Sequence, residues 1–183
     1  MMRPRDEQLR RALRSAASAL KEHGPRFALA GSYALWVFGA PEPVHDVDFV
    51  VAEADTEAAA TTLAKAGFVI ERTPEDWLFK AHAEDVVVDV LHRVNGVAVG
   101  AEHLDRAEEH DVMAIRIPVL TPTTVLIQKL LALGEHFCDF TSLLPAVRGV
   151  RERFDWQQVR AATAENDYAV AFLVLADRLR ITA

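Results

Sequence analysis

Apolar positions near the start of the chain first recur with the period of a helix and then form a short continuous run. Between about residues 6 and 22, leucine and alanine return every three or four positions, which is the spacing of one face of a helix. These positions are Leu9, Leu13, Ala16, Ala17 and Leu20. Gly24 and Pro25 predict the end of this helix. The apolar run Phe27–Ala30 that follows predicts a short buried strand.

Strand and helix patterns then alternate along the chain. Residues 33–38 are mostly apolar and are stopped by glycine and prolines, which predicts a short helix, and Val47–Val51 predicts a second strand. Asp55 is placed to cap a helix that runs to about Ala66, where a glycine follows. Residues 68–70 then begin another strand.

Two further strand patterns flank a charged turn. The runs Trp77–His82 and Val86–Leu91 are separated by residues 83–85, which predicts an antiparallel hairpin. The strand pattern Ile115–Leu120 precedes Thr121, an N-cap residue followed by proline at the first helical position. From Gly134 onward the pattern is helical, with helices expected at His136–Val147, Asp155–Ala164 and Tyr168–Leu179.

This order of elements predicts an α/β fold, which some classifications call α+β. We expect a small mixed β-sheet flanked by helices, with a C-terminal helical bundle. The strand patterns end near residue 120, so we expect a sheet-containing domain over residues 1–120 and a helical region over residues 121–183. A cleft between the sheet and the bundle is where we expect a ligand.

Charge and composition narrow the class of protein. The formal net charge is −7 and there is no lysine or arginine tract, so a nucleic-acid substrate needs a local basic patch. Candidates are Arg3, Arg5, Arg10, Arg11 and Arg14 near the N-terminus and Arg148, Arg151 and Arg153 further on. The single Cys138 excludes an intrachain disulfide, and no apolar stretch is long enough to span a bilayer. We therefore expect a soluble, cytoplasmic protein with no membrane partner.

Paired carboxylates carry the clearest chemical signal. Asp46 and Asp48 flank Val47 at the start of an apolar strand, where alternate residues point to the same face. Two like charges held so close repel each other unless a cation lies between them, and Mg²⁺ or Mn²⁺ suits such oxygen ligands. Asp89 interrupts another apolar strand, so it either faces solvent or shares the metal site. This arrangement indicates phosphoryl or nucleotidyl transfer.

The order Gly31-Ser32, then Asp46-Val47-Asp48, then Asp89 resembles the nucleotidyltransferase fold of the DNA polymerase β superfamily. The resemblance implies Asp46, Asp48 and Asp89 as metal ligands, with Asp89 also a candidate base. It implies that Gly31 lets the backbone approach the triphosphate of an NTP such as ATP, and that Ser32 donates to a phosphate.

The C-terminal half is similar to bacterial AbiEii/MenT-type nucleotidyltransferase toxins. The similarity lies in the helix of residues 122–133 with its Lys129, and in Asp139 on the next helix. It implies that Lys129 neutralises triphosphate charge, that Asp139 contributes to nucleotide binding, that the acceptor is the 3′ end of tRNA, and that a cognate antitoxin is a partner. Lys129 alternatively snorkels at the edge of the core. The chain departs from the toxins at Val44, where they commonly carry serine or threonine.

Other interpretations stay open at this point. Within the enzyme class, the acceptor is alternatively a small molecule or a hydroxyl of a partner protein. A non-catalytic binding module of a toxin–antitoxin pair is a different class, but it has no reason to keep three mutually repelling carboxylates. A zinc site from His136 and Cys138 is not expected, because residues two apart do not share a face of the expected helix. The tryptophans, Trp36, Trp77 and Trp156, are interpreted as core or interface aromatics.

Overall fold

The computed structural model describes residues 4–182. A seven-stranded mixed sheet lies at the centre of the larger part of the molecule. The strand order is β3-β4-β5-β2-β1-β9-β8. The strands are β1 (Phe27–Ala30), β2 (Val47–Val51), β3 (Val69–Arg72), β4 (Leu78–Ala83), β5 (Val86–Leu91), β8 (Ala107–Val112) and β9 (Ile115–Leu120). Between β5 and β8, the strands β6 (Arg93–Val94) and β7 (Val97–Ala98) form a separate hairpin.

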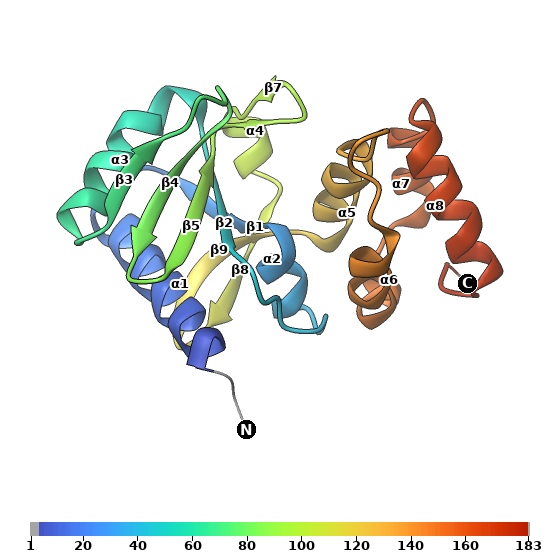
Figure 1. The fold of residues 1–183 in the computed structure, drawn as a ribbon, viewed down its shortest axis with the longest axis horizontal. Coiled ribbons are helices and arrows are strands. Elements are labelled where there is room, and N and C mark those ends of the chain that lie inside the picture. The colour runs from blue at the N-terminus through green and yellow to red at the C-terminus, as the bar shows by residue number, and fades with distance from the viewer. Residues whose placement is uncertain (1–3, 183) are drawn as a thin grey trace.

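Helices lie against the sheet and beyond it (Figure 1). Those within the sheet part are α1 (Pro4–His23), α2 (Gly31–Val37), α3 (Thr56–Lys65) and the short α4 (Ala101–Leu104). After β9 the chain continues as α5 (Pro122–Leu131), α6 (Phe140–Gly149), α7 (Trp156–Ala162) and α8 (Asp167–Arg178). Helices α1 and α3 pack against each other, while α2 joins the sheet to α5 and α6. No helix within residues 4–182 is both long and apolar enough to span a membrane.

Strand register at the centre of the sheet sets up the site. Strand β2 runs antiparallel to β1 and parallel to β5. Ala30 lies opposite Asp48, and Asp48 lies opposite Asp89. Asp89 in turn lies opposite Lys80 of the antiparallel neighbour β4. Because paired residues share a sheet face, these four side chains form one row across four strands.

The two faces of β2 have different environments. Val47, Phe49 and Val51 are fully buried on one face, where Phe49 packs edge-on against Phe27 with ring centroids 5.6 Å apart. The opposite face carries Asp48 and Val50, which line a cleft. This alternation explains how one short strand can be anchored in the core and still present a carboxylate to a cleft.

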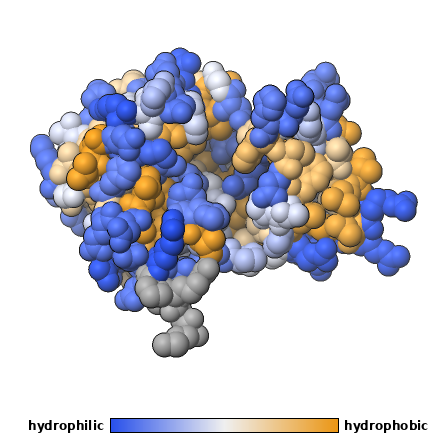
Figure 2. Space-filling view, viewed as in Figure 1, coloured by the Kyte–Doolittle hydropathy of each residue, from blue (hydrophilic) through white to orange (hydrophobic). Residues whose placement is uncertain are grey.

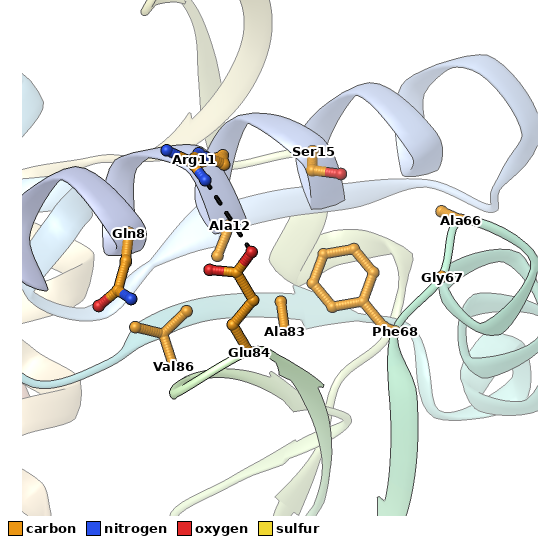
Figure 3. Close-up of a pocket in the computed structure, with 10 residues that line it drawn as sticks. All are labelled: Gln8, Arg11, Ala12, Ser15, Ala66, Gly67, Phe68, Ala83, Glu84 and Val86. Carbon is orange, nitrogen blue, oxygen red and sulfur yellow. Dashed lines mark ion pairs between the residues drawn. The ribbon is translucent and has the colours of Figure 1, made fainter.

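Helix α1 meets the β4–β5 hairpin around a second, small hollow of about 130 Å³ (Figure 3). Arg11 of α1 reaches Glu84 of the hairpin turn across it, with an N–O distance of 3.9 Å. Both side chains are largely exposed, so this ion pair contributes little stability. This hollow shares no lining residue with the cleft that Asp48 and Val50 line.

The expected α/β fold with its mixed sheet and C-terminal helices is confirmed. Local details differ from the predictions. Asp55 stands at the N-cap of α3 and Ala66 at its C-cap, as expected, but the Asp55 side chain makes no capping bond, because a 3₁₀ turn over Glu53–Asp55 leads directly into the helix. The helix expected from His136 begins only at Phe140, because Gly134 and Phe137 exchange backbone hydrogen bonds of 2.9 and 3.1 Å in a tight turn.

Candidate active site

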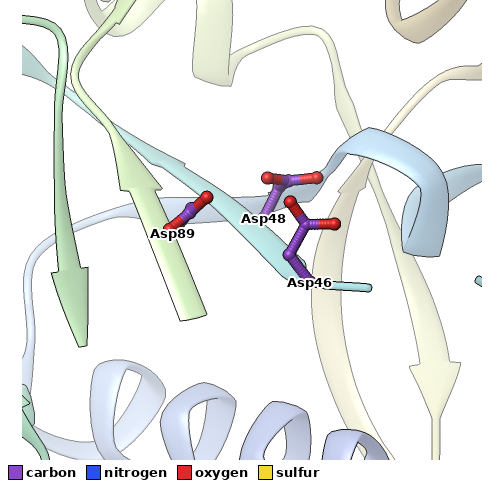
Figure 4. Close-up of side chains that lie close together, drawn as sticks. All are labelled: Asp46, Asp48 and Asp89. Carbon is purple, nitrogen blue, oxygen red and sulfur yellow. The ribbon is translucent and has the colours of Figure 1, made fainter. Parts of the chain in front are cut away.

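Three carboxyl groups converge where β2 and β5 lie side by side (Figure 4). Asp46 immediately precedes β2, Asp48 lies on β2, and Asp89 lies on β5. One oxygen atom from each lies within 4.8 Å of the others. The structure therefore brings together the three residues that the sequence assigned to a metal site, and Asp89 is buried in this cluster and does not face solvent.

The pKa of Asp48 shows that its ionised form is destabilised by its surroundings. Burial, with added repulsion from Asp46, raises the pKa of Asp48 to about 7. Repulsion from Asp89 acts in the same direction, while the positive charges of Lys129 and Lys80 oppose the rise. A hard divalent cation with oxygen ligands, such as Mg²⁺ or Mn²⁺, would relieve this repulsion, so the residues present fit such an ion.

Gly31 is required beside Asp48 for two separate reasons. Its φ angle is +59°, in the left-handed region that favours glycine. A Cβ atom at this position would lie 1.8 Å from Oδ2 of Asp48, so the carboxylate occupies the space that a side chain would fill. Ser32 follows in the first turn of α2 and is half-buried. Within residues 4–182, Ser32 is not among the cleft-lining residues.

Asp89 has a direct partner that the sequence analysis did not identify. Nζ of Lys80 donates a hydrogen bond of 3.0 Å to Oδ1 of Asp89 across the β4–β5 pair. Burial raises the pKa of Asp89, and the bond from Lys80 opposes that rise. A two-residue turn at Glu84 and Asp85 fixes this register. A two-residue turn, in place of the expected turn over 83–85, would have paired Lys80 with Asp89 from the sequence alone.

A cleft of about 660 Å³ opens in front of Asp48, between the sheet and the C-terminal helices. The space-filling view shows a notch between these two parts of the molecule (Figure 2). Of the residues that the sequence singled out, Gly31, Asp48, Lys129 and Asp139 line the cleft. The helical wall is otherwise largely apolar, with Val125, Leu133 and Leu143.

Lys129 and Asp139 occupy the helical wall in different ways. Lys129 lies on α5, half-buried, and its charge favours the ionised form of Asp48. In the described part of the chain it forms no ion pair, so its charge is available to a ligand. Asp139 is the N-cap of α6 and accepts hydrogen bonds from the backbone N–H groups of Thr141 and Ser142, at 2.9 and 3.3 Å. Hydrogen bonds from Thr141 and Ser142 lower the pKa of Asp139.

The N-terminal arginines are placed away from this cleft. Arg10 forms a bidentate ion pair with Glu42, with both N–O distances 2.6 Å, and its guanidinium lies over the ring of Trp36. Arg11 pairs with Glu84. Arg3 lies outside the described residues. No described residue of α1 lines the cleft, so these arginines form no part of its wall.

Solved nucleotidyltransferase structures share the fold. ANT(2″)-Ia in complex with adenylyl-2″-tobramycin has a TM-score of 0.68 at 12% identity, over 86% of this chain and 96% of that chain. A nucleotidyltransferase-like structure from Thermotoga maritima has a TM-score of 0.54 at 22% identity, over 71% and 86%. The lincomycin-bound lincosamide adenylyltransferase LnuA has a TM-score of 0.52 at 14% identity, over 84% and 97%. These likenesses show the fold.

The sequence itself identifies the family. No curated protein matches the chain. A family model described as nucleotidyl transferase of unknown function (DUF2204) matches residues 9–148, a span that includes all three carboxylates, Gly31, Lys129 and Asp139. The chain therefore belongs to this family of nucleotidyltransferases and is an enzyme of the nucleotidyl-transfer class.

Proposed function

We propose that this enzyme transfers a nucleoside monophosphate from an NTP to a hydroxyl group of a small-molecule acceptor, with release of pyrophosphate. The observation that carries the proposal is the carboxylate cluster of Asp46, Asp48 and Asp89 beside Lys129, which forms no ion pair within residues 4–182, at the edge of a cleft of about 660 Å³. Nucleotidyl transfer needs this combination of cation-binding oxygens and a positive charge for phosphate.

Each residue has a role that follows from its place. Asp46, Asp48 and Asp89 would hold Mg²⁺ or Mn²⁺, which neutralises phosphate charge and lowers the pKa of a bound hydroxyl group. Lys129 supplies a point charge to the triphosphate from the helical wall. Lys80 holds Oδ1 of Asp89, which leaves Oδ2 to accept the proton of the acceptor hydroxyl. Gly31 leaves room for the Asp48 carboxylate.

The charge of the cleft favours a small acceptor over RNA. Asp76 and Asp139 line the cleft in addition to Asp48, against the cations Arg93 and Lys129, of which Arg93 is paired with Glu53. With a net charge of −7 over the chain, this lining favours a cationic acceptor over the many phosphates of an RNA. Two of the fold relatives, ANT(2″)-Ia and LnuA, were solved with an adenylylated antibiotic and an antibiotic, respectively, which supports a small acceptor here.

The 3′ end of tRNA, with an antitoxin as partner, is the second candidate. Its support is the exposed group formed by Arg148, Arg151 and Arg153 at the end of α6 and in the following 3₁₀ turn. This group could bind an acceptor stem outside the cleft.

Labelling experiments separate these acceptors. Each α-³²P-labelled NTP is incubated with Mg²⁺ and the enzyme, together with either total RNA or a panel of amine-bearing alcohols that includes tobramycin and lincomycin. We expect a labelled small molecule with the parent enzyme and none with Asp48→Asn. Asp85→Asn, a change of an exposed aspartate in the β4–β5 turn, is the matched control and keeps full activity. A labelled tRNA band with unlabelled alcohols would establish the second candidate instead.

A further inference from the structure

Two large aromatic side chains stand exposed at the mouth of the cleft. Trp77 is 43% exposed and Phe137 is 63% exposed, and both line the cleft. They come from different parts of the molecule, because Trp77 precedes β4 and Phe137 lies in the turn between α5 and α6. Aromatic rings left in water at the rim of a concave site are typical of a surface that a ligand covers.

The backbone at both aromatic residues is held in place. The carbonyl oxygen of Trp77 accepts hydrogen bonds from the N–H groups of His92 and Arg93, at 3.0 and 3.1 Å. Phe137 exchanges two backbone hydrogen bonds with Gly134. The backbone positions from which the rings project are therefore fixed, so ligand binding has to order only the side chains.

The other two tryptophans already have partners within the chain. The ring of Trp36 lies under the guanidinium of Arg10, at 5.5 Å, and packs against Tyr33. Trp156 donates from Nε1 to the carbonyl of Arg151 and packs against Phe154. Trp77 is the tryptophan that lines the cleft within residues 4–182.

An apolar surface connects the carboxylates with these rings. Val50 and Leu91 follow Asp48 and Asp89 by two residues on the same strand faces, so they lie about 7 Å further along the sheet. Val94 and Leu133, and with them Val125 and Leu143, add apolar surface from the hairpin and the helices. A group bound here extends from the phosphate end of the cleft over an apolar floor.

Two amide side chains lie along the same wall. Nδ2 of Asn95 donates 3.0 Å to the backbone carbonyl of Gln128, which ties the β6–β7 turn to α5. This bond leaves Oδ1 of Asn95 and the side-chain amide of Gln128 to face a ligand, and both residues line the cleft. Amides of this kind can pair with the polar edge of a base.

We propose that this region is the nucleobase subsite, with the base of the NTP stacked by Trp77 and Phe137 over the apolar floor and its edge facing Asn95 and Gln128. The inference rests on the proposed function, because the phosphates are placed at Asp48 and Lys129. A flat ring with apolar faces and polar edges suits this surface, whereas a polyhydroxylated acceptor would leave its hydroxyl groups unpaired against valine and leucine.

Binding measurements with and without the base test the subsite. Affinities for ATP and for inorganic tripolyphosphate are measured by calorimetry in the presence of Mg²⁺, because tripolyphosphate carries the phosphates alone. We expect Trp77→Ala and Phe137→Ala each to weaken ATP binding roughly fivefold or more, and to leave tripolyphosphate binding unchanged. Tyr168→Ala, which removes an exposed aromatic side chain on α8, is the matched control and changes neither affinity.

Tryptophan fluorescence gives an independent measurement. We expect ATP, but not tripolyphosphate, to quench the emission of the parent protein, and we expect Trp77→Phe to remove most of that quenching at saturating ATP. Equal loss of affinity for both ligands in Trp77→Ala, unchanged ATP affinity, or a quench that persists in Trp77→Phe would each overturn the subsite. A parent protein that binds neither ligand would instead overturn the proposed function.

Discussion

The sheet wall and the helical wall of the cleft are built on different principles. On the sheet wall, Asp48 and Asp89 take their places from strand register, and backbone hydrogen bonds fix the spacing of their strands. Gly31 directly follows β1, whose last residue, Ala30, lies opposite Asp48. On the helical wall, Lys129 and Leu133 depend on how α5 packs against α2, α7 and α8. A wall set by backbone pairing suits charges whose separation matters, whereas a wall of packed side chains suits recognition of a substrate.

Gly31→Ala tests the geometry of the sheet wall and is expected to have the largest effect on the rate of nucleotidyl transfer. The new Cβ would meet Oδ2 of Asp48 at 1.8 Å, so the carboxylate must leave its position. We expect the rate of nucleotidyl transfer to fall on the order of a hundredfold or more, with weaker Mn²⁺ binding in paramagnetic resonance titrations. Gly67→Ala is the control, because its φ is also positive, at +95°, but its Cβ meets nothing within 4 Å. Equal losses in both variants would reduce the effect to backbone strain.

Lys129→Ala tests whether the helical wall also takes part in the chemistry. Loss of the charge facing the triphosphate should lower kcat/KM for the NTP by about tenfold or more, with the folded state retained. Lys65→Ala, a change of an exposed lysine on α3, should leave kcat/KM unchanged. Normal kinetics combined with a lower urea midpoint would show that Lys129 covers the core edge and has no catalytic part.

Lys80→Met tests how the hydrogen bond from Lys80 to Asp89 affects the reaction. Without its 3.0 Å hydrogen bond, Asp89 loses the interaction that opposes the rise of its pKa. The acidic limb of the pH–rate profile should therefore move to higher pH, with a few-fold lower kcat at neutral pH. Lys80→Arg should restore much of the parent profile. An unchanged profile in Lys80→Met would mean that Asp89 does not limit the rate.

Stability of the metal-free protein should show the smallest effect. Folded Asp48 keeps its proton up to about pH 7, while in the unfolded chain the pKa returns to 3.8. Between these values the folded state binds more protons, so the free energy of unfolding attributable to this group decreases as pH rises and is constant above about pH 7. A shift of about three pKa units corresponds to about 4 kcal/mol in full. Because Asp48 faces a cleft that is open to solvent, we expect a decrease on the order of 1 kcal/mol. Urea unfolding in EDTA should show it in the parent and not in Asp48→Asn.

The sheet wall could largely be predicted from the sequence. Alternation along a strand places Asp46 and Asp48 together whatever the rest of the fold does. The hairpin pattern places Asp89 on a strand beside β4, whereas its place beside Asp48 was implied by the resemblance to nucleotidyltransferases, because the parallel pairing of β2 with β5 has no local signal. Lys80 was missed only because the turn was taken one residue too long. Strand β8, with its sequence AEEHDV, was missed because this edge strand is mostly exposed and charged, so it lacks the apolar alternation that marks a strand.

The helical wall was predicted in outline but not in detail. Lys129 falls on the expected helix, because Thr121 and Pro122 mark its start. The turn at Gly134–Phe137 was assigned to a helix, and Trp77 was interpreted as a core or interface aromatic. The packing of distant segments decides which aromatic residues face a cleft, and local periodicity does not predict that packing. The catalytic roles of the predicted site residues and the domain boundary at residue 120 stay predictions.

The hydrogen bond from Asn95 to the backbone of Gln128 connects the β6–β7 hairpin to α5 in the helical wall. This hairpin lies outside the main sheet, so its length can vary without shifting the row of residues from Ala30 to Lys80. The anchoring point on α5 is a backbone carbonyl, which every residue type provides. Insertions or deletions in the six residues Arg93 to Ala98 would therefore change the opening and the Asn95 side of the nucleobase subsite, while the row of carboxylates keeps its register. For protein engineering, this short segment is where nucleotide selectivity can be changed without moving the metal ligands.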